Sequence, residues 1–247
     1  MIATAAVVIV IFLATLIRSS IGFGEALIAV PLLSLVLPVE VSAPLAVLFS
    51  ITVALVIVSS DWRSIHIRSA VWLVIPTLFG IPLGLYALKS APEIAVKTVL
   101  AVIIIGFSAW SLTRGAHLEL KNDKLAFLFG FAAGVLGGAY GMNGPPLAVY
   151  GSLRRWTPAN FRATLQGYFL PASIAGMVGY WSAGFWTPAV TRDYLIALPG
   201  SIAAIYLGRI INKRTHARRF VLYVHGGLIV IGAILLAQAW LSTDARF

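Results

Sequence analysis

Several stretches of about 20 residues carry almost no charge, and they restrict the fold more than any other feature of the chain. Segments 69–88 and 220–241 are examples. A helix rises 1.5 Å per residue, so about 20 apolar residues cross a hydrocarbon core of roughly 30 Å. The composition agrees, because 11% of the 247 residues are charged, whereas soluble domains carry about 25%. The sequence therefore predicts an all-α, polytopic membrane protein.

Two kinds of apolar region alternate along the chain. Six segments are long enough to span a membrane as continuous helices: 42–60, 69–88, 94–113, 163–183, 194–211 and 220–241. Two other regions, 2–37 and 125–153, are interrupted by glycine and proline, which break helices. The pieces that follow the interruptions, 26–37 and 145–153, are short for a full crossing. Both interrupted regions are therefore predicted to form broken helices or re-entrant hairpins.

The two halves of the chain resemble each other. Four residues recur 124 positions later, namely Trp62 as Trp186, Arg68 as Arg192, Gly84 as Gly208 and Lys89 as Lys213. Each half also contains one interrupted region followed by three spans, a pattern typical of secondary transporters. The sequence predicts a first repeat over 1–113, a linker over 114–124 and a second repeat over 125–241.

The distribution of Lys and Arg predicts the orientation in the membrane. If both interrupted regions fold back as hairpins, most of these residues lie on one side, which includes the loops 61–68, 114–124 and 211–219. Cytoplasmic loops carry an excess of Lys and Arg, so these loops, including the linker, are predicted to be cytoplasmic and both termini external. Each repeat then crosses three times, and this odd number makes the two repeats inverted.

Composition also limits the chemistry. The formal net charge is +10, but the cations lie in short clusters between apolar spans, where they set topology and meet anionic lipid. No basic face of a soluble element suggests nucleic-acid binding. There is no cysteine, and the four histidines are scattered. We expect no metal site, no cofactor and no enzymatic activity, because catalytic and ligand motifs are missing.

The interrupted regions are the candidate functional site. Backbone that leaves a helix at membrane depth persists only where protein buries it or where it lines a water-filled cavity. Two half-helix N-termini that face one cavity would bind an anion through free N–H groups and the helix dipole. The alternative is that the glycines only allow close helix packing, which is the interpretation we adopt for Gly80, Gly84, Gly176 and Gly179.

The candidate substrate-binding residues come from both interruptions. They are Arg18, Ser20, Gly22, Phe23, Gly24, Glu25, Tyr140, Gly141, Asn143, Gly144 and Pro145. Asn143 is predicted to be the N-cap of the second half-helix. Asn143, Gly141 and Gly144 are expected to offer donors to substrate oxygens, and Ser20 a hydroxyl.

Two of these residues are charged, and each has two interpretations. Arg18 attracts the anion or pairs with Glu25, or else extends to the membrane interface if the first helix crosses fully. Glu25 begins a half-helix whose dipole favours the carboxylate, whereas burial favours the acid. It is predicted to couple the movement of a proton, or of sodium, to transport. The alternative is a structural carboxylate that caps the half-helix or neutralises Arg18.

At these residues the chain resembles the TauE/SafE family of sulfite exporters, also called the toluenesulfonate uptake permease (TSUP) family. The resemblance rests on Ile21-Gly22-Phe23-Gly24 followed by Pro31, on the duplicate from Gly134 to Pro146, and on Arg162-Ala163-Thr164. The common Gly-Gly-Gly run of the family is Gly22-Phe23-Gly24 here. The resemblance implies a carrier that moves sulfite or a small organosulfonate across the cytoplasmic membrane. A passive anion channel and a membrane assembly factor without transport activity are the alternatives.

Overall fold

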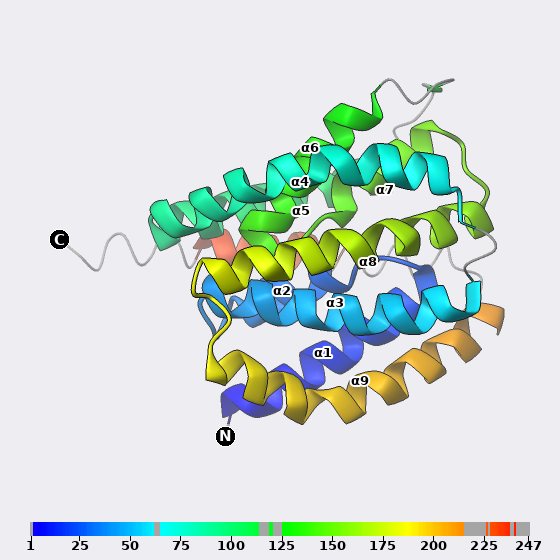
Figure 1. The fold of residues 1–247 in the computed structure, drawn as a ribbon. Coiled ribbons are helices and arrows are strands. Elements are labelled where there is room, and N and C mark those ends of the chain that lie inside the picture. The colour runs from blue at the N-terminus through cyan, green and yellow to red at the C-terminus, as the bar shows by residue number, and fades with distance from the viewer. Residues whose placement is uncertain are drawn as a thin grey trace.

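The computed structural model describes residues 2–61, 65–113, 119–120, 125–214, 226, 228–237 and 240. These residues form helices joined by short connections, and no β-strand occurs among them. The helices are α1 (Ile2–Ile21), α2 (Glu25–Leu33), α3 (Val39–Asp61), α4 (Ile67–Ser90), α5 (Glu93–Thr113), α6 (Ala126–Tyr140), α7 (Gly144–Leu153), α8 (Pro158–Ser182) and α9 (Pro188–Arg214). A further apolar helix covers Leu228–Ala237. The long helices run side by side across the molecule (Figure 1).

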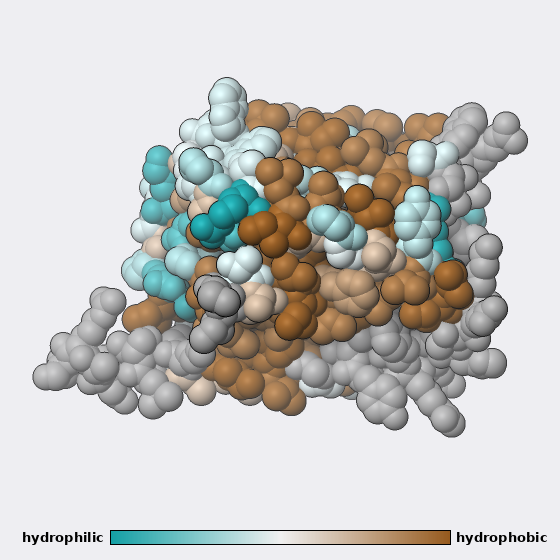
Figure 2. Space-filling view, turned by 90° about the horizontal axis from the view of Figure 1, so that it is seen from below, coloured by the Kyte–Doolittle hydropathy of each residue, from teal (hydrophilic) through white to brown (hydrophobic). Residues whose placement is uncertain are grey.

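Among the described residues, four helices are long and apolar enough to cross a membrane. They cover Val39–Ser59, Ile67–Ser90, Glu93–Thr113 and Pro188–Ile211, and they match four of the predicted spans. Hydrophobic residues cover much of the face shown in Figure 2, as expected for a surface in contact with lipid. These features confirm the prediction of an all-α, polytopic membrane protein.

The remaining two predicted spans differ from those four. Helix α8 has 25 residues, but it carries polar side chains that include Arg162 and Gln166, and it is not among the four apolar spans. The predicted span 220–241 lies partly outside the described residues. Its described part is the short helix Leu228–Ala237.

Both predicted interruptions are present. Helix α1 is separated from α2 by residues 22–24, where Gly22 and Gly24 have φ angles of +104° and +99°. Helix α6 ends at Gly141, with a φ of +66°. A positive φ is readily adopted only by glycine, which explains why these residues end the helices. The second arms, α2 and α7, have nine and ten residues and pack beside α1 and α6 respectively.

The most extensive helix contacts are between the two predicted repeats. The most extensive contacts join α4 to α6 and α1 to α9, and each pair combines the first helix of one repeat with an equivalent span of the other. Helix α3 packs on α8, where the hydroxyls of Ser50 and Ser173 hydrogen-bond at 3.0 Å across a separation of 123 positions. This symmetry of contacts supports the division into repeats at 1–113 and 125–241, which stays a prediction.

Glycines bring the backbones of α4 and α6 into direct contact. A Cβ at Gly84 of α4 would collide with the carbonyl oxygen of Val135, and a Cβ at Gly134 of α6 would collide with that of Thr77. The hydroxyl of Thr77 crosses the same interface and donates to the carbonyl of Gly130 at 2.8 Å. Small residues that allow close approach are typical of helix contacts within membranes.

The predicted packing role holds for three of the four glycines named from the sequence. At Gly80 and Gly84 a Cβ would meet backbone atoms of α6, and at Gly179 it would meet the side chain of Leu85. A Cβ at Gly176 would have no atom within 4 Å. Gly176 is buried, but the close contact expected from the packing prediction is absent there.

We expect Gly84→Ala to destabilise the protein by roughly 1–3 kcal/mol, the usual cost of overpacking a dense interior. The added methyl would meet backbone atoms of Val135 and Ala139, so the helices must separate. Gly106→Ala on α5 is the matched control, because its Cβ meets nothing within 4 Å. Thermal unfolding in detergent measures both. Equal midpoints for the two variants would contradict the close contact.

Candidate functional site

The two interruptions meet at one small cavity. Its lining comprises Arg18, Gly24, Glu25, Ala26, Leu27, Ser50, Gly141, Met142, Asn143, Gly144 and Phe169. Its volume is about 20 Å³, and a single water needs roughly 10–15 Å³ by the same measure. In this conformation the cavity therefore accommodates about one water, and a polyatomic anion would have to widen it.

The cavity lies at the N-termini of two short helices. Residues 24–27 begin α2, and residues 141–144 lead into α7. The first N–H groups of a helix have no acceptor within the helix, and the dipole makes this end positive. Pro145 stands in the first turn of α7, where the missing N–H removes no hydrogen bond. Both helix ends thus favour a negative charge in the cavity.

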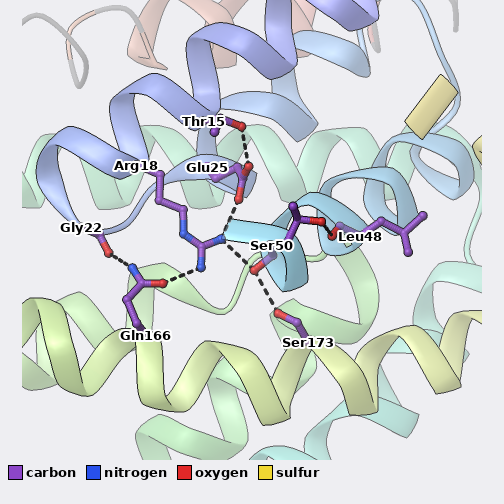
Figure 3. A network of polar contacts seen from close by, with 9 residues as sticks. Thr15, Arg18, Gly22, Glu25, Leu48, Ser50, Gln166 and Ser173 are labelled. Carbon is purple, nitrogen blue, oxygen red and sulfur yellow. Dashed lines mark hydrogen bonds and ion pairs between the residues drawn. The ribbon is translucent and has the colours of Figure 1, made fainter. Parts of the chain in front are cut away.

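Arg18 of α1 brings a fixed positive charge to the same place (Figure 3). Its Nη1 donates to Oε2 of Glu25 at 2.6 Å and to Oγ of Ser50 at 2.9 Å. Its Nη2 donates to Oε1 of Gln166 at 2.8 Å. Four helices, α1, α2, α3 and α8, therefore converge on one guanidinium group.

Glu25 completes the ion pair. Its Oε2 accepts from Arg18, while its Oε1 accepts from the hydroxyl of Thr15 at 2.8 Å. The side chains of Arg18 and Glu25 are 3% and 1% exposed, so each charge depends on the other for stabilisation. This burial excludes the interpretation in which Arg18 extends to the interface. It shows the predicted contact between Arg18 and Glu25.

The guanidinium group is also held from one face. The ring of Phe169 lies against it, with 4.9 Å from Cζ of Arg18 to the ring centre. A cation over an aromatic face is attracted by the ring quadrupole. Phe169 and Ser173 share one side of α8 with Gln166, at helical spacing. Ser173 hydrogen-bonds Ser50 and so supports the group that accepts from Arg18.

Six of the predicted site residues line the cavity together: Arg18, Gly24, Glu25, Gly141, Asn143 and Gly144. The other five are placed beside it. Ser20 donates its hydroxyl to the carbonyl of Leu16, and Tyr140 donates to that of Val96.

The remaining three shape the interruptions. Phe23 packs edge-on against Phe161, with ring centres 5.8 Å apart. The carbonyl of Gly22 accepts a hydrogen bond from Gln166. Pro145 is buried in the first turn of α7.

Asn143 occupies the predicted N-cap position of α7, but its side chain does not cap the helix. Asn143 precedes α7, but its backbone is already helical and its side chain makes no capping hydrogen bond. Its Nδ2 instead donates to the hydroxyl of Tyr168 at 3.3 Å, and that hydroxyl also contacts Thr77 at 2.7 Å. The side chain is thus engaged with α8, which the sequence pattern at the break does not indicate.

The sequence analysis did not identify five residues that contact Arg18, Glu25 or Ser50 through their side chains: Thr15, Ser50, Gln166, Phe169 and Ser173. Four of them are polar residues inside apolar helices, where polar groups usually face the interior and serve a function. That signal was available, but it does not tell which face of each helix points inward. No group of three or more His, Asp or Glu side chains in the described part of the chain could hold a metal ion.

Comparison with known proteins agrees with this architecture. The family model described as "Sulfite exporter TauE/SafE" matches residues 7–235. The chain is also 26% identical over 180 residues to a Cupriavidus necator protein described as "Probable sulfite/organosulfonate exporter TauE", a match that covers 72% of this chain and 70% of that protein. No solved structure was found to match. Because the family model matches most of the chain, including both interrupted regions, this membrane transport protein belongs to the TauE/SafE family of sulfite exporters.

Proposed function

We propose that the protein is a secondary carrier of sulfite or a small organosulfonate in the cytoplasmic membrane, that it works by alternating access, and that it couples the anion to a cation, most simply a proton. The observation that carries this proposal is the cavity between the starts of α2 and α7, with the buried Arg18 in its lining. The family and the Cupriavidus necator relative support the class of substrate.

Arg18 is suited to hold the anion. Three of the hydrogen bonds that a guanidinium can donate go to Glu25, Ser50 and Gln166. The Nε–H has no hydrogen-bond partner within the described residues. Guanidinium groups match the oxygen spacing of oxoanions and form charge-assisted hydrogen bonds with them. The amides at the start of α2 and at Gly144 add uncharged donors on the other sides of the cavity.

The ion pair supplies a reason for coupling. Arg18 and Glu25 together are neutral, so an anion that enters alone would leave a net negative charge in a buried site, which is costly. If Glu25 takes a proton as the anion arrives, the site stays neutral and Arg18 exchanges one anionic partner for another. Anion and proton would then travel together.

Alternating access is supported by the arrangement of the helices. The site lies where α1, α2 and α3 of the first predicted repeat meet α7 and α8 of the second. Inverted repeats that rock about a central site are a common basis of alternating access. We propose the orientation expected from the sequence, with both termini external and 114–124 cytoplasmic. The cavity is too small for the anion, as expected for a carrier between its two open conformations. A continuously open channel would instead have a pore wide enough for the anion.

Uptake into proteoliposomes tests the proposal. A labelled organosulfonate is the better probe, because a sulfonate stays ionised across the pH range used. We expect saturable uptake that accumulates the anion when a pH gradient is imposed and that sulfite inhibits by competition. Conductance that does not saturate and ignores the gradient would indicate a channel. Uptake no faster than in empty liposomes, with either anion, would contradict transport.

A further inference from the structure

We infer that Gln166 is a positioning residue for transport: it holds the guanidinium of Arg18 in the orientation that receives the anion. This inference rests on the proposed function. Gln166 belongs to the second predicted repeat, and Arg18 belongs to the first.

The amide of Gln166 bonds to two groups, one a hydrogen-bond donor and the other an acceptor. Its Oε1 accepts from Nη2 of Arg18 at 2.8 Å, and its Nε2 donates to the carbonyl oxygen of Gly22 at 2.5 Å. Reversing the amide would place its NH₂ group against a cation and its oxygen against a carbonyl. The side chain is 1% exposed, so water does not compete for these bonds. Gln166 therefore has one stable orientation.

The carbonyl that Gln166 contacts belongs to the interruption itself. Gly22 adopts a φ of +104° directly after α1, and a Cβ there would lie 2.9 Å from Cγ of Arg162. The position of Gln166 is thus tied to the backbone between α1 and α2 on one side and to Arg18 on the other (Figure 3). A change in the interruption would reach the guanidinium through this amide as well as through Glu25.

The contacts of α8 define how the guanidinium lies. The ring of Phe169 lies against Cζ of Arg18, and Gln166 restrains rotation of the guanidinium by holding Nη2. Arginine has several rotatable bonds and loses side-chain entropy when it is ordered. Because Gln166 helps to order Arg18 before the anion arrives, binding does not have to supply all of that free energy.

The neutral amide also matters electrostatically. The charged residues that face Gln166 are Arg18 on α1 and its partner Glu25 on α2, and on its own helix Arg162 packs its aliphatic part against Gly22. An amide oxygen accepts from Arg18 without cancelling its charge. A carboxylate at position 166 would add a second anion beside Arg18 and compete directly with the substrate.

Two substitutions separate positioning from general structure. Gln166→Leu removes both hydrogen bonds, and we expect its apparent KM for a sulfonate to rise about tenfold or more at every pH, with a smaller change in the maximal rate. Gln166→Glu in its protonated form has the same acceptor and donor as glutamine. We therefore expect its KM, divided by that of the wild type at the same pH, to be near one in acid and to rise about tenfold or more as the new carboxyl ionises.

Asn160→Asp is the matched control, because it makes the same change from amide to acid at the start of α8, away from the cavity. Its KM relative to wild type should not vary with pH. Wild-type uptake together with an unchanged KM for Gln166→Leu, or a pH-independent ratio for Gln166→Glu, would overturn the positioning role. Absence of uptake by the wild-type protein would instead contradict the proposed function. If Gln166→Leu fails to fold, the pH series of Gln166→Glu decides alone.

Discussion

Arg18→Gln is expected to abolish measurable transport. The substitution removes the buried positive charge from the cavity between α2 and α7. Loss of one partner from a buried, hydrogen-bonded charge pair costs about 2–5 kcal/mol, which corresponds to a roughly 30-fold or greater loss of affinity for the anion. Uptake of a labelled sulfonate into proteoliposomes, measured at several concentrations, reports this change.

A single substitution at Arg18 also affects folding. It leaves the carboxylate of Glu25, 1% exposed, with Thr15 as the remaining side-chain donor that contacts it within the described residues. An uncompensated buried charge destabilises a protein by roughly 3–5 kcal/mol. The double variant Arg18→Gln/Glu25→Gln removes both charges and should recover thermal stability relative to Arg18→Gln alone. Transport should stay absent in the double variant, because the anion still lacks its positive partner.

Arg155→Gln provides the matched control just after α7. Arg155 also forms an ion pair, with Glu119 at 3.2 Å, but the two side chains are 62% and 43% exposed, and exposed pairs contribute little to stability. We expect wild-type transport and stability from this variant. Full transport by folded Arg18→Gln, or by the double variant, would exclude Arg18 from the anion site.

The sequence was most informative where chemistry and backbone geometry coincide. Glycine at 22, 24 and 141 marks positions of positive φ, and no other residue type adopts that conformation as readily. The two interruptions, and therefore the region of the two helix N-termini at the cavity, were predicted from the clusters of glycine and proline around these positions. The contact of Arg18 with Glu25 was also foreseen as one of the alternatives, since seven residues and one break separate the two.

The contribution of α8 was harder to predict. Gln166 and Ser173 lie in a segment whose sequence indicates only a continuous helix. Contacts such as Gln166 with Gly22 join residues 144 positions apart, and their existence depends on how the repeats dock and rotate. Helical periodicity places Gln166, Phe169 and Ser173 on one side, but it does not reveal what that side faces.

Asn143 shows the limit of a local rule. Asparagine before Gly-Pro-Pro is a strong N-cap signal from sequence, yet the neighbouring α8 offers the hydroxyl of Tyr168 at 3.3 Å. The close approach of Gly137 to the Asn143 amide further confines the side chain. Tertiary packing therefore determined the rotamer, and local capping did not.

Glu25→Gln is expected to uncouple the carrier. The oxygen of glutamine can accept from Arg18 in place of Oε2, and its NH₂ group can donate to the Thr15 hydroxyl, which in the wild type donates to Oε1. Glutamine cannot take up a proton. Arg18 then stays positive without a competing carboxylate, so the anion should bind at least as well as in the wild type. Release of the anion without a proton would leave an unpaired buried cation, which is unfavourable.

Accumulation and exchange of sulfonate, measured separately in proteoliposomes, test this expectation. Glu25→Gln should lose accumulation driven by a pH gradient while it retains exchange of internal for external sulfonate, because exchange never empties the site of its anion. Glu93→Gln is the control: Glu93 pairs with Lys97 on α5 and is 56% exposed, so that variant should accumulate sulfonate normally.

The asymmetry of the site explains why one residue can have so large an effect. The first predicted repeat places Glu25 at the start of α2, whereas the second has the neutral Asn143 before α7, so a single carboxyl serves both half-helices. Gradient-driven accumulation by Glu25→Gln with the pH dependence of the wild type would assign the coupling to another group and leave Glu25 as the structural partner of Arg18.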